Sequence, residues 1–196
     1  MKVGVLALQG DFAEHLAILR RLGAEGVEVR LPSHLDDIEA LIIPGGESTT
    51  IGKLAYAFDL LDPLRVFGQM RPIWGTCAGA IFLSRDTLEG QHLLGLMDIT
   101  VERNAFGRQA DSFESEIPVP VLENPETPFP AIFIRAPLIA SVGPEVDILA
   151  RLLNNDDSGI IVAAKQGHFL ATSFHPELTG DDRFHRYFLS LMKRDL

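Results

Sequence analysis

The sequence predicts an α/β fold with a mostly parallel open sheet and helices on both faces, and two observations carry this prediction. Short apolar runs alternate with segments of helical periodicity, which is typical of strand-helix-strand units. Several runs are continuously apolar, as parallel strands covered on both faces are. The chain has 196 residues, 46% of them hydrophobic, which is enough to bury one substantial core. We therefore expect a single domain over residues 1–196.

The first half of the chain supplies the predicted parallel strands. The run from Val3 to Leu8 is almost continuously apolar and predicts the first strand. Residues 12–22 place apolar side chains at helical spacing, and Gly23 suits the position just past a helix end. The next apolar runs predict three further strands and the start of a helix, at residues 27–31, 41–43, 73–75 and 78–83.

The second half has a different character. Five prolines between Pro118 and Pro130 exclude a long helix there, so residues 98–133 are expected to add antiparallel strands or loops to the sheet, with residues 118–130 as the longest loop. Apolar runs on both sides of Gln166-Gly167 predict a hairpin. A final amphipathic helix is predicted over residues 182–193.

Charge and cysteine content exclude several classes of protein. Acidic residues outnumber basic ones 27 to 17, and the formal charge of −10 repels phosphates and anionic lipid. We therefore expect neither nucleic acid nor a membrane as a general partner. The single cysteine excludes an intrachain disulfide and fits a reducing compartment. No signal peptide and no apolar run of about 20 residues is found, so a cytoplasmic location is expected.

A cysteine lies at the junction between a predicted strand and a predicted helix. The segment Gly75-Thr76-Cys77-Ala78-Gly79 has the Gly-x-Cys-x-Gly spacing of a nucleophile elbow, in which a sharp turn lifts the nucleophile above the sheet. Small residues leave room for that turn, and free N–H groups at the helix N-terminus stabilise a thiolate. A lone cysteine is also compatible with a small buried core residue. The spacing favours Cys77 as a nucleophile.

A histidine and a glutamate follow the last predicted strand. In an extended segment residues two apart point to the same side, so His175 and Glu177 can face one site. A carboxylate on one ring nitrogen fixes the tautomer and leaves the other nitrogen for the thiol of Cys77, which is the logic of a catalytic triad. The alternative is a histidine that caps a loop beside a solvated glutamate.

A glycine-rich loop, Pro44-Gly45-Gly46-Glu47-Ser48-Thr49-Thr50, follows the third predicted strand. Ligands of open α/β sheets gather outside the carboxyl ends of the strands, so this loop and the elbow are expected at one edge. We expect the backbone N–H groups of Gly46 and Ala78 to stabilise an oxyanion. The alternative is a plain turn followed by a Ser/Thr helix cap.

Nine segments, in order across nearly the whole chain, resemble one branch of the class I glutamine amidotransferases, the glutaminase subunits of pyridoxal 5′-phosphate synthases. The segments are Leu8-Gln9-Gly10, Pro44-Gly45-Gly46-Glu47-Ser48-Thr49-Thr50, Gly75-Thr76-Cys77-Ala78-Gly79, Val101-Glu102-Arg103-Asn104, Phe106-Gly107-Arg108-Gln109, Asp111-Ser112-Phe113-Glu114, Phe133-Ile134-Arg135-Ala136-Pro137, Ala163-Ala164-Lys165-Gln166-Gly167 and Phe174-His175-Pro176-Glu177-Leu178-Thr179.

The resemblance implies a flavodoxin-like amidotransferase fold and a triad of Cys77, His175 and Glu177. It implies that L-glutamine is hydrolysed to glutamate and ammonia through a cysteine thioester. It also implies a protein partner, a synthase subunit that uses the ammonia to make pyridoxal 5′-phosphate. The residues that it implies for glutamine binding are Gly46, Glu47, Ser48, Arg103, Ile134 and Arg135.

Three other functions compete with this interpretation. The chain could serve a different synthase, act as a cysteine-based redox or stress protein of similar fold, or be a non-catalytic binding module. In a redox protein the His175-Pro176-Glu177 segment would have no role, and a decayed enzyme usually loses one member of its triad. We expect no bound cofactor and no metal site, because one cysteine and dispersed histidines give no ligand spacing.

Overall fold

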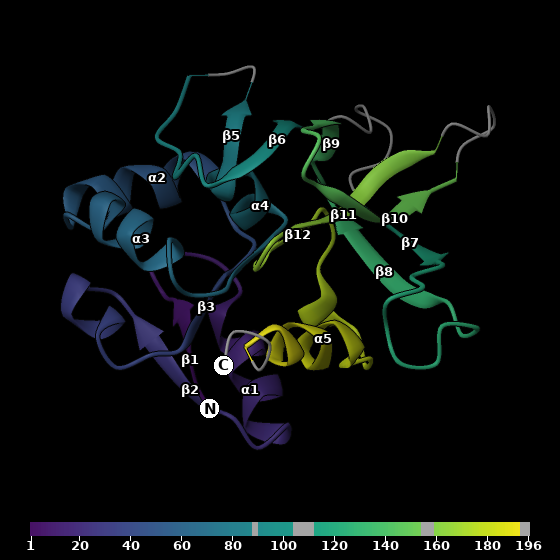
Figure 1. The fold of residues 1–196 in the computed structure, drawn as a ribbon, viewed down its shortest axis with the longest axis horizontal. Coiled ribbons are helices and arrows are strands. Elements are labelled where there is room, and N and C mark those ends of the chain that lie inside the picture. The colour runs from purple at the N-terminus through teal and green to yellow at the C-terminus, as the bar shows by residue number, and fades with distance from the viewer. Residues whose placement is uncertain (88–89, 104–111, 154–158, 193–196) are drawn as a thin grey trace.

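The computed structural model describes residues 1–87, 90–103, 112–153 and 159–192 (Figure 1). Five neighbouring strands pair in parallel and form the centre of the main sheet. Their order is β2 (Glu25–Val29), β1 (Lys2–Leu6), β3 (Ala40–Ile43), β4 (Ile73–Thr76) and β12 (Phe169–Thr172). The predicted mostly parallel sheet is therefore confirmed, although β2 begins at Glu25, two residues before the apolar run. This edge strand is half exposed, so its first residues need no apolar side chains.

The sheet continues from β12 through strands that include antiparallel pairs. The predicted hairpin joins β11 (Ile160–Gln166) to β12, and Gly167 in its turn has φ +55°. Glycine at the first position of a two-residue turn matches the twist of the two strands. Beyond β11 the order is β9 (Leu138–Val142), β6 (Met97–Glu102) and β5 (Ser84–Thr87), and β10 (Asp147–Leu152) also pairs with β11.

Helices cover both faces of the parallel strands (Figure 1). One face carries α2 (Ser48–Ala57), α3 (Leu61–Gly68) and α4 (Ala78–Leu83), and the other carries α1 (Phe12–Arg21) and α5 (Arg183–Leu191). Two 3-10 turns, η1 (Pro32–Leu35) and η2 (Pro176–Leu178), lie in connections. The predicted end of the last helix at residue 193 lies outside the described residues. None of the helices in the described ranges is long and apolar enough to cross a membrane.

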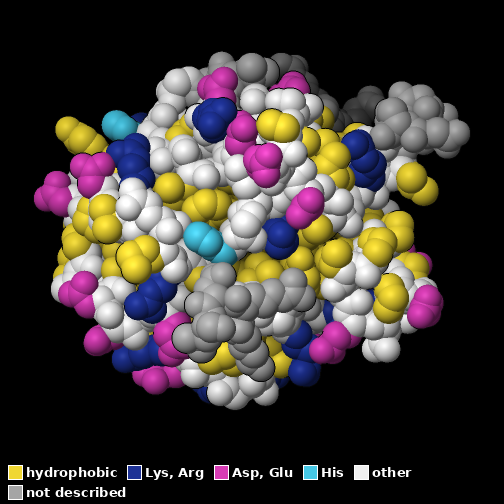
Figure 2. All heavy atoms as spheres, in the orientation of Figure 1, with side chains coloured by type: hydrophobic (Ala, Val, Ile, Leu, Met, Phe, Trp, Pro, Cys, Tyr) yellow, Lys and Arg dark blue, Asp and Glu magenta, His cyan; other side chains and the backbone are white. Residues whose placement is uncertain are grey.

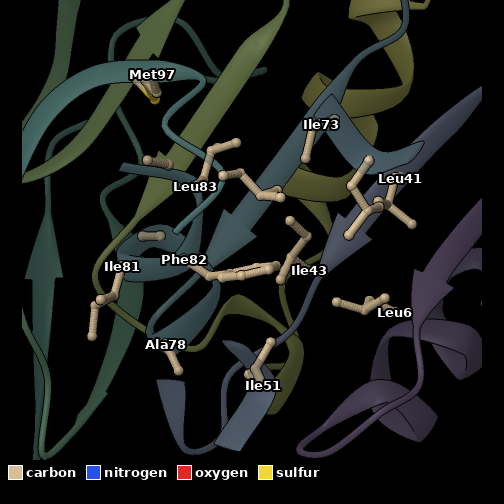
Figure 3. Packing of buried hydrophobic residues seen from close by; sticks show 14 of the residues in the cluster. Leu6, Leu41, Ile43, Ile51, Ile73, Ala78, Ile81, Phe82, Leu83 and Met97 are labelled. Atoms are coloured by element: carbon tan, nitrogen blue, oxygen red, sulfur yellow. The ribbon is translucent and has the colours of Figure 1, made fainter. Parts of the chain in front are cut away.

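Each parallel strand sends alternate side chains into two cores. In β3, Leu41 and Ile43 join the core under α2 to α4, whereas Ala40 and Ile42 join the core under α1 and α5. Figure 3 shows Ile43 beside Phe82 of α4 in the first core. All four β3 side chains are fully buried, which explains why this strand reads as a continuous apolar run.

The second core also contains a small separate sheet, which was not predicted from the sequence. Strands β7 (Ser112–Ile117) and β8 (Phe129–Ile134) pair only with each other, although residues 98–133 were expected to extend the main sheet. Among the described residues of that region, β6 alone joins the main sheet. The reason is aromatic packing: the ring of Phe129 lies 4.8 Å from Phe184 and that of Phe133 lies 5.6 Å from Phe174, edge to face.

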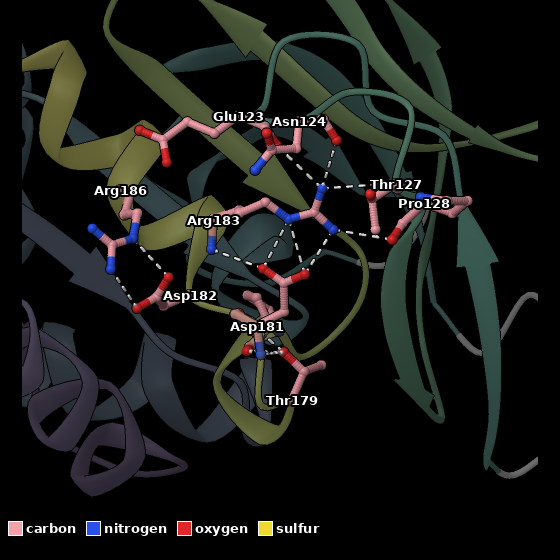
Figure 4. Close-up of polar contacts among 10 residues, drawn as sticks. Glu123, Asn124, Thr127, Pro128, Thr179, Asp181, Asp182, Arg183 and Arg186 are labelled. Atoms are coloured by element: carbon pink, nitrogen blue, oxygen red, sulfur yellow. Dashed lines mark hydrogen bonds and ion pairs between the residues drawn. The ribbon is translucent and has the colours of Figure 1, made fainter.

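One arginine ties α5 to the long loop between β7 and β8 (Figure 4). The guanidinium of Arg183 donates to the backbone carbonyls of Glu123, Asn124, Thr127 and Pro128, at 2.8 to 3.2 Å. It also forms a two-pronged contact with Asp181, with a shortest distance of 2.7 Å. A planar group with five donors can satisfy several carbonyls at once, which a lysine cannot do.

Two buried histidines join α1 to α5. The Nδ1 atom of His15 lies 2.9 Å from the Nε2 atom of His185, and both side chains have no exposed surface. Trp74 packs edge to face against both rings, at 5.8 Å from His15 and 4.9 Å from His185. Burial lowers the pKa of His15 well below its ordinary value and lowers that of His185 to about 3, so both rings are neutral.

The surface mixes charges of both signs. Figure 2 shows acidic and basic side chains interspersed over the visible face. The formal charge of −10 is therefore not gathered into one continuous acidic patch on this face.

The substitution Arg183→Met should lower the free energy of unfolding by about 1–3 kcal/mol, because four carbonyls and Asp181 lose their donor. Arg186→Met is the matched control, since the ion pair of Arg186 with Asp182 spans one exposed helix turn and does not reach the carbonyls of the loop in the described structure. Urea unfolding of both variants measures the difference. Equal losses of unfolding free energy in the two variants would show that the contacts of Arg183 with the loop contribute no more than a surface ion pair.

Stability should fall below pH 6.5 partly through His185. In the unfolded chain His185 takes up a proton near pH 6.5, whereas in the native protein its pKa is about 3. The stability that His185 contributes is therefore fully present above pH 6.5 and is lost progressively as pH falls from 6.5 toward 3. The unfolding free energy should decrease between pH 6 and pH 5, and this decrease should be smaller in His185→Phe by about 1.4 kcal/mol. The core variant Phe188→Leu should keep the original slope.

Candidate active site

A cavity of about 390 Å³ opens where the carboxyl ends of β1, β3 and β4 meet. The cavity brings together nine of the ten predicted site residues, and the tenth, Glu177, lies directly behind His175. The lining residues are Gln9, Asp11, Gly46, Glu47, Ser48, Cys77, Ala78, Ile81, Arg103, Ile134, Arg135, Pro137, His175 and Leu178.

The elbow at Cys77 has the strained backbone that its spacing predicts. Cys77 has φ +48° and ψ −108°, and it immediately precedes α4. A side chain at position 79 would collide with the carbonyl of Ile43, and one at position 75 would collide with the carbonyl of Gly79. Only glycines fit at both positions, because the elbow backbone packs against the end of β3 at Gly79 and against its own next turn at Gly75. The Cys77 side chain thus reaches the cavity, although only 6% of the residue is exposed.

His175 and Glu177 form the predicted pair, but by a different local structure. The Nδ1 atom of His175 lies 2.7 Å from Oε1 of Glu177. Glu177 belongs to the 3-10 turn η2 that starts at Pro176, so the expectation of an extended segment with both side chains on one side is wrong. Proline sets the φ angle of that turn, and the turn carries the carboxylate back under the ring. The backbone N–H of His175 donates to the carbonyl of Ile132 at 2.8 Å, which anchors the segment on β8.

Opposing effects act on the charge of this pair. Burial lowers the pKa of His175, but contacts with Asp11, Cys77 and Glu177 outweigh it and raise the pKa well above the ordinary value. Burial raises the pKa of Glu177, while the contact with His175 opposes that rise. The proton between the two is therefore held on the histidine, by a carboxylate that is itself 5% exposed.

Asp11 is a member of the cluster that sequence reasoning missed. Its Oδ2 atom lies 3.4 Å from Nδ1 of His175, and it lies at the start of α1, after β1. Its position beyond the end of a predicted parallel strand was the available signal. Donor atoms of Asp11, His175 and Glu177 lie within 4.8 Å of one another, a donor set that metals use. However, the 2.7 Å contact between His175 and Glu177 already occupies two of those atoms.

The glycine-rich loop lies against the segment that follows β1. The Glu47 N–H donates to Oε1 of Gln9 at 2.6 Å, and the Asp11 N–H donates to the Gly45 carbonyl at 3.1 Å. A side chain at position 45 would collide with the ring of His175, and Gly46 has φ +153°. The backbone of the loop therefore lies directly over the histidine.

The remaining predicted residues line the same cavity with distinct contacts. Arg103 pairs with Glu47 at 2.9 Å rather than being a free cation, and Ser48 is 3% exposed with its hydroxyl 3.3 Å from Gln91. The Ile134 carbonyl lies 4.0 Å from the Cys77 sulfur. Arg135 has φ +42°, a rare conformation for a residue with a side chain.

Part of the resemblance cannot be placed. The predicted segment at residues 106–109 and the adjoining positions 104 and 111 lie outside the described residues. The described part of the cavity combines a thiol, a histidine with an orienting carboxylate, and backbone groups of two glycine-containing turns. Such an arrangement is suited to acyl transfer through a covalent intermediate.

Sequence comparison adds independent evidence. Residues 5–194 match the SNO glutamine amidotransferase family. The chain is 59% identical over 196 residues to the pyridoxal 5′-phosphate synthase subunit PdxT of Herpetosiphon aurantiacus, a match that covers 97% of this chain and 100% of that protein. Its identity to the PdxT subunit of Chloroflexus aurantiacus is 54%, over the same shares of the two chains.

Solved structures agree with the sequences. A crystal structure of a glutamine amidotransferase matches with a TM-score of 0.89 at 50% identity, covering 97% of this chain and 98% of that one. The structure of PurLQS from Thermotoga maritima shares the fold alone, with a TM-score of 0.70 at 17% identity over 96% of this chain and 97% of that one. The predicted fold class and the resemblance are both confirmed, and the chain belongs to the SNO glutamine amidotransferase family.

Proposed function

We propose that this chain is the glutaminase subunit of a pyridoxal 5′-phosphate synthase, and that Cys77, His175 and Glu177 form its catalytic triad. The observation that carries the triad is the 2.7 Å contact between His175 and Glu177 in the same cavity as Cys77. The full-length similarity to PdxT subunits supports the choice of synthase.

In the first half of the reaction, the Cys77 thiolate attacks the side-chain amide carbon of glutamine. The N–H groups of Gly46 and Ala78 stabilise the oxyanion of the tetrahedral intermediate, a contribution of about 10²–10³ in rate for one such donor. The C–N bond then breaks. The imidazolium of His175 gives its proton to the departing nitrogen, and ammonia leaves a γ-glutamyl thioester on Cys77.

In the second half, His175 is neutral and takes a proton from water as the water oxygen attacks the thioester carbon. The C–S bond breaks, glutamate is released, and the thiolate and imidazolium return. Glu177 orients the ring and stabilises its charge in both halves. The net reaction is glutamine plus water to glutamate plus ammonia.

Substrate contacts follow from the lining of the cavity. Arg135 supplies a cation for the substrate carboxylate, and Arg103 acts through its ion pair with Glu47, which fixes both side chains in the lining of the cavity. The Ile134 carbonyl offers a hydrogen-bonding group 4.0 Å from the sulfur, and the Ser48 hydroxyl offers another in the lining of the cavity. These assignments rest on the lining of the cavity and on the family resemblance.

Ammonia release is expected to depend on the synthase partner. Free ammonia is wasted, and the Gly45-Gly46 peptide belongs to a loop flexible enough to change when a partner docks. The side chain of Gln9 accepts a hydrogen bond from the N–H of Glu47 at 2.6 Å, and this bond holds the loop in one conformation. A catalytic thiol that must stay reduced supports a cytoplasmic location.

The first test measures glutamate release from L-glutamine by the chain alone and with added synthase subunit. We expect strong stimulation by the synthase, and Cys77→Ser should abolish release while its thermal unfolding stays unchanged. Equal rates with and without the synthase would remove the partner-dependent step. Near-normal release by Cys77→Ser would remove the thioester mechanism, and no release by the unaltered chain would favour the redox alternative.

A second test separates orientation from binding. Glu177→Gln keeps the shape but removes the charge that holds His175 protonated, so kcat should fall by about 10²-fold or more while glutamine still binds. Steady-state kinetics with the synthase, together with calorimetric titration of glutamine, give the two quantities. An unchanged kcat would exclude Glu177 from the triad.

A further inference from the structure

The second carboxylate oxygen of Glu177 is the starting point. Its Oε1 atom contacts His175, but Oε2 is fully buried and accepts no hydrogen bond from the described residues. The nearest ionic contact of Oε2 is the ring of His15, whose Nε2 atom lies 3.4 Å away. A buried carboxylate oxygen without a donor is costly, so the state of His15 matters for Glu177.

The contacts of the two histidines favour one pair of tautomers. His15 Nε2 faces Glu177, and also the Thr76 hydroxyl at 3.4 Å, while His15 Nδ1 faces His185 at 2.9 Å. If Nε2 carries the hydrogen, this nitrogen lies 3.4 Å from both Oε2 of Glu177 and the Thr76 hydroxyl, and Nδ1 accepts a hydrogen from His185 Nε2. The remaining atom, His185 Nδ1, is then an unprotonated nitrogen, and it has no partner among the described residues.

The opposite tautomers fit worse. With the hydrogen on His15 Nδ1, the lone pair of His15 Nε2 would face the carboxylate oxygen, and His185 would carry a buried N–H at Nδ1 with no acceptor in the described part of the chain. Orphaned buried N–H groups are rarer than under-satisfied acceptors.

We propose that His15, backed by His185, is a positioning residue whose neutral ring N–H lies beside the carboxylate of Glu177, with its nitrogen 3.4 Å from Oε2, and so keeps this glutamate ionised beneath His175. The inference rests on the proposed function, since it extends the triad of Cys77, His175 and Glu177 inward by two histidines. His15 does not line the cavity, and its contact with the proposed triad is at Glu177.

Two neighbouring charged groups act on Glu177 in opposite directions. Glu177 faces His175, which favours its ionised form, and Asp11, whose negative charge opposes it. His15 faces His185 and His175, and burial together with these neighbours lowers its pKa, so its ring stays neutral and adds no charge beside Glu177. At the far end, His185 faces Asp182 and Arg21, which act in opposite directions.

The test compares His15→Leu, which removes the donor, with His15→Gln, which can present an N–H near the same point. Phe188→Leu is the packing control, because Phe188 contacts Trp74 in the same core at 5.5 Å but contributes no polar group. Two quantities are measured across pH: kcat and KM for glutamine in the complex with the synthase, and the rate at which iodoacetamide alkylates Cys77. Thermal unfolding confirms that each variant is folded.

We expect His15→Leu to lower kcat roughly 10-fold to 100-fold with little change in KM, because Glu177 takes up a proton and releases His175. The acid limb of the pH profile of kcat, and that of the alkylation rate of Cys77, should each move to higher pH by about one unit. His15→Gln should recover most of kcat and the original acid limb, and Phe188→Leu should leave both profiles in place.

Two outcomes would overturn the inference: an acid limb that stays in place in His15→Leu, or one that moves equally in Phe188→Leu. The alkylation profile separates this failure from failure of the proposed function. If the unaltered complex releases no glutamate, the glutaminase assignment fails, yet a shift of the alkylation profile in His15→Leu alone would still support the contact between His15 and Glu177.

Discussion

The site depends on how closely three backbones approach at one edge of the sheet. The elbow packs on the last carbonyl of β3 through Gly79, and the glycine-rich loop packs on the ring of His175 through Gly45. Gly10 touches the same loop from the end of β1. Any Cβ atom at these points would push the elements apart, so thiol, imidazole and loop could not share one cavity. The geometry of the site therefore depends on glycine, the residue without a side chain, at these three positions.

Much of the fold could be predicted because parallel strands buried on both faces need apolar residues throughout. Because of that requirement β1, β3 and β4 could be predicted from their apolar runs, and the β11–β12 hairpin could be predicted from the glycine in its tight turn. The edge strand β2 was misplaced by two residues because exposed positions leave no such pattern. The separate β7–β8 sheet was missed because aromatic packing against α5, which is a long-range contact, decides where those strands lie.

The site was predictable where chemistry and spacing coincide in one short segment. Cys77 is identified by its flanking glycines, and His175 with Glu177 by their proximity in sequence, even though a 3-10 turn rather than an extended strand joins them. Asp11 and His15 gave no such local pattern. They come from α1 and its first turn, and they reach Glu177 or His175 only because α1 lies beside η2 and α5 in the folded chain.

The edge strand β2 bears on how copies of this protein behave toward one another. It pairs with β1 on one side only, and the backbone groups on its other side could template a strand from a second molecule. Glu25 and Glu28 lie on this short strand and are exposed. Pairing with the same strand of another copy would bring glutamates from both copies together, so charge repulsion at this edge disfavours aggregation.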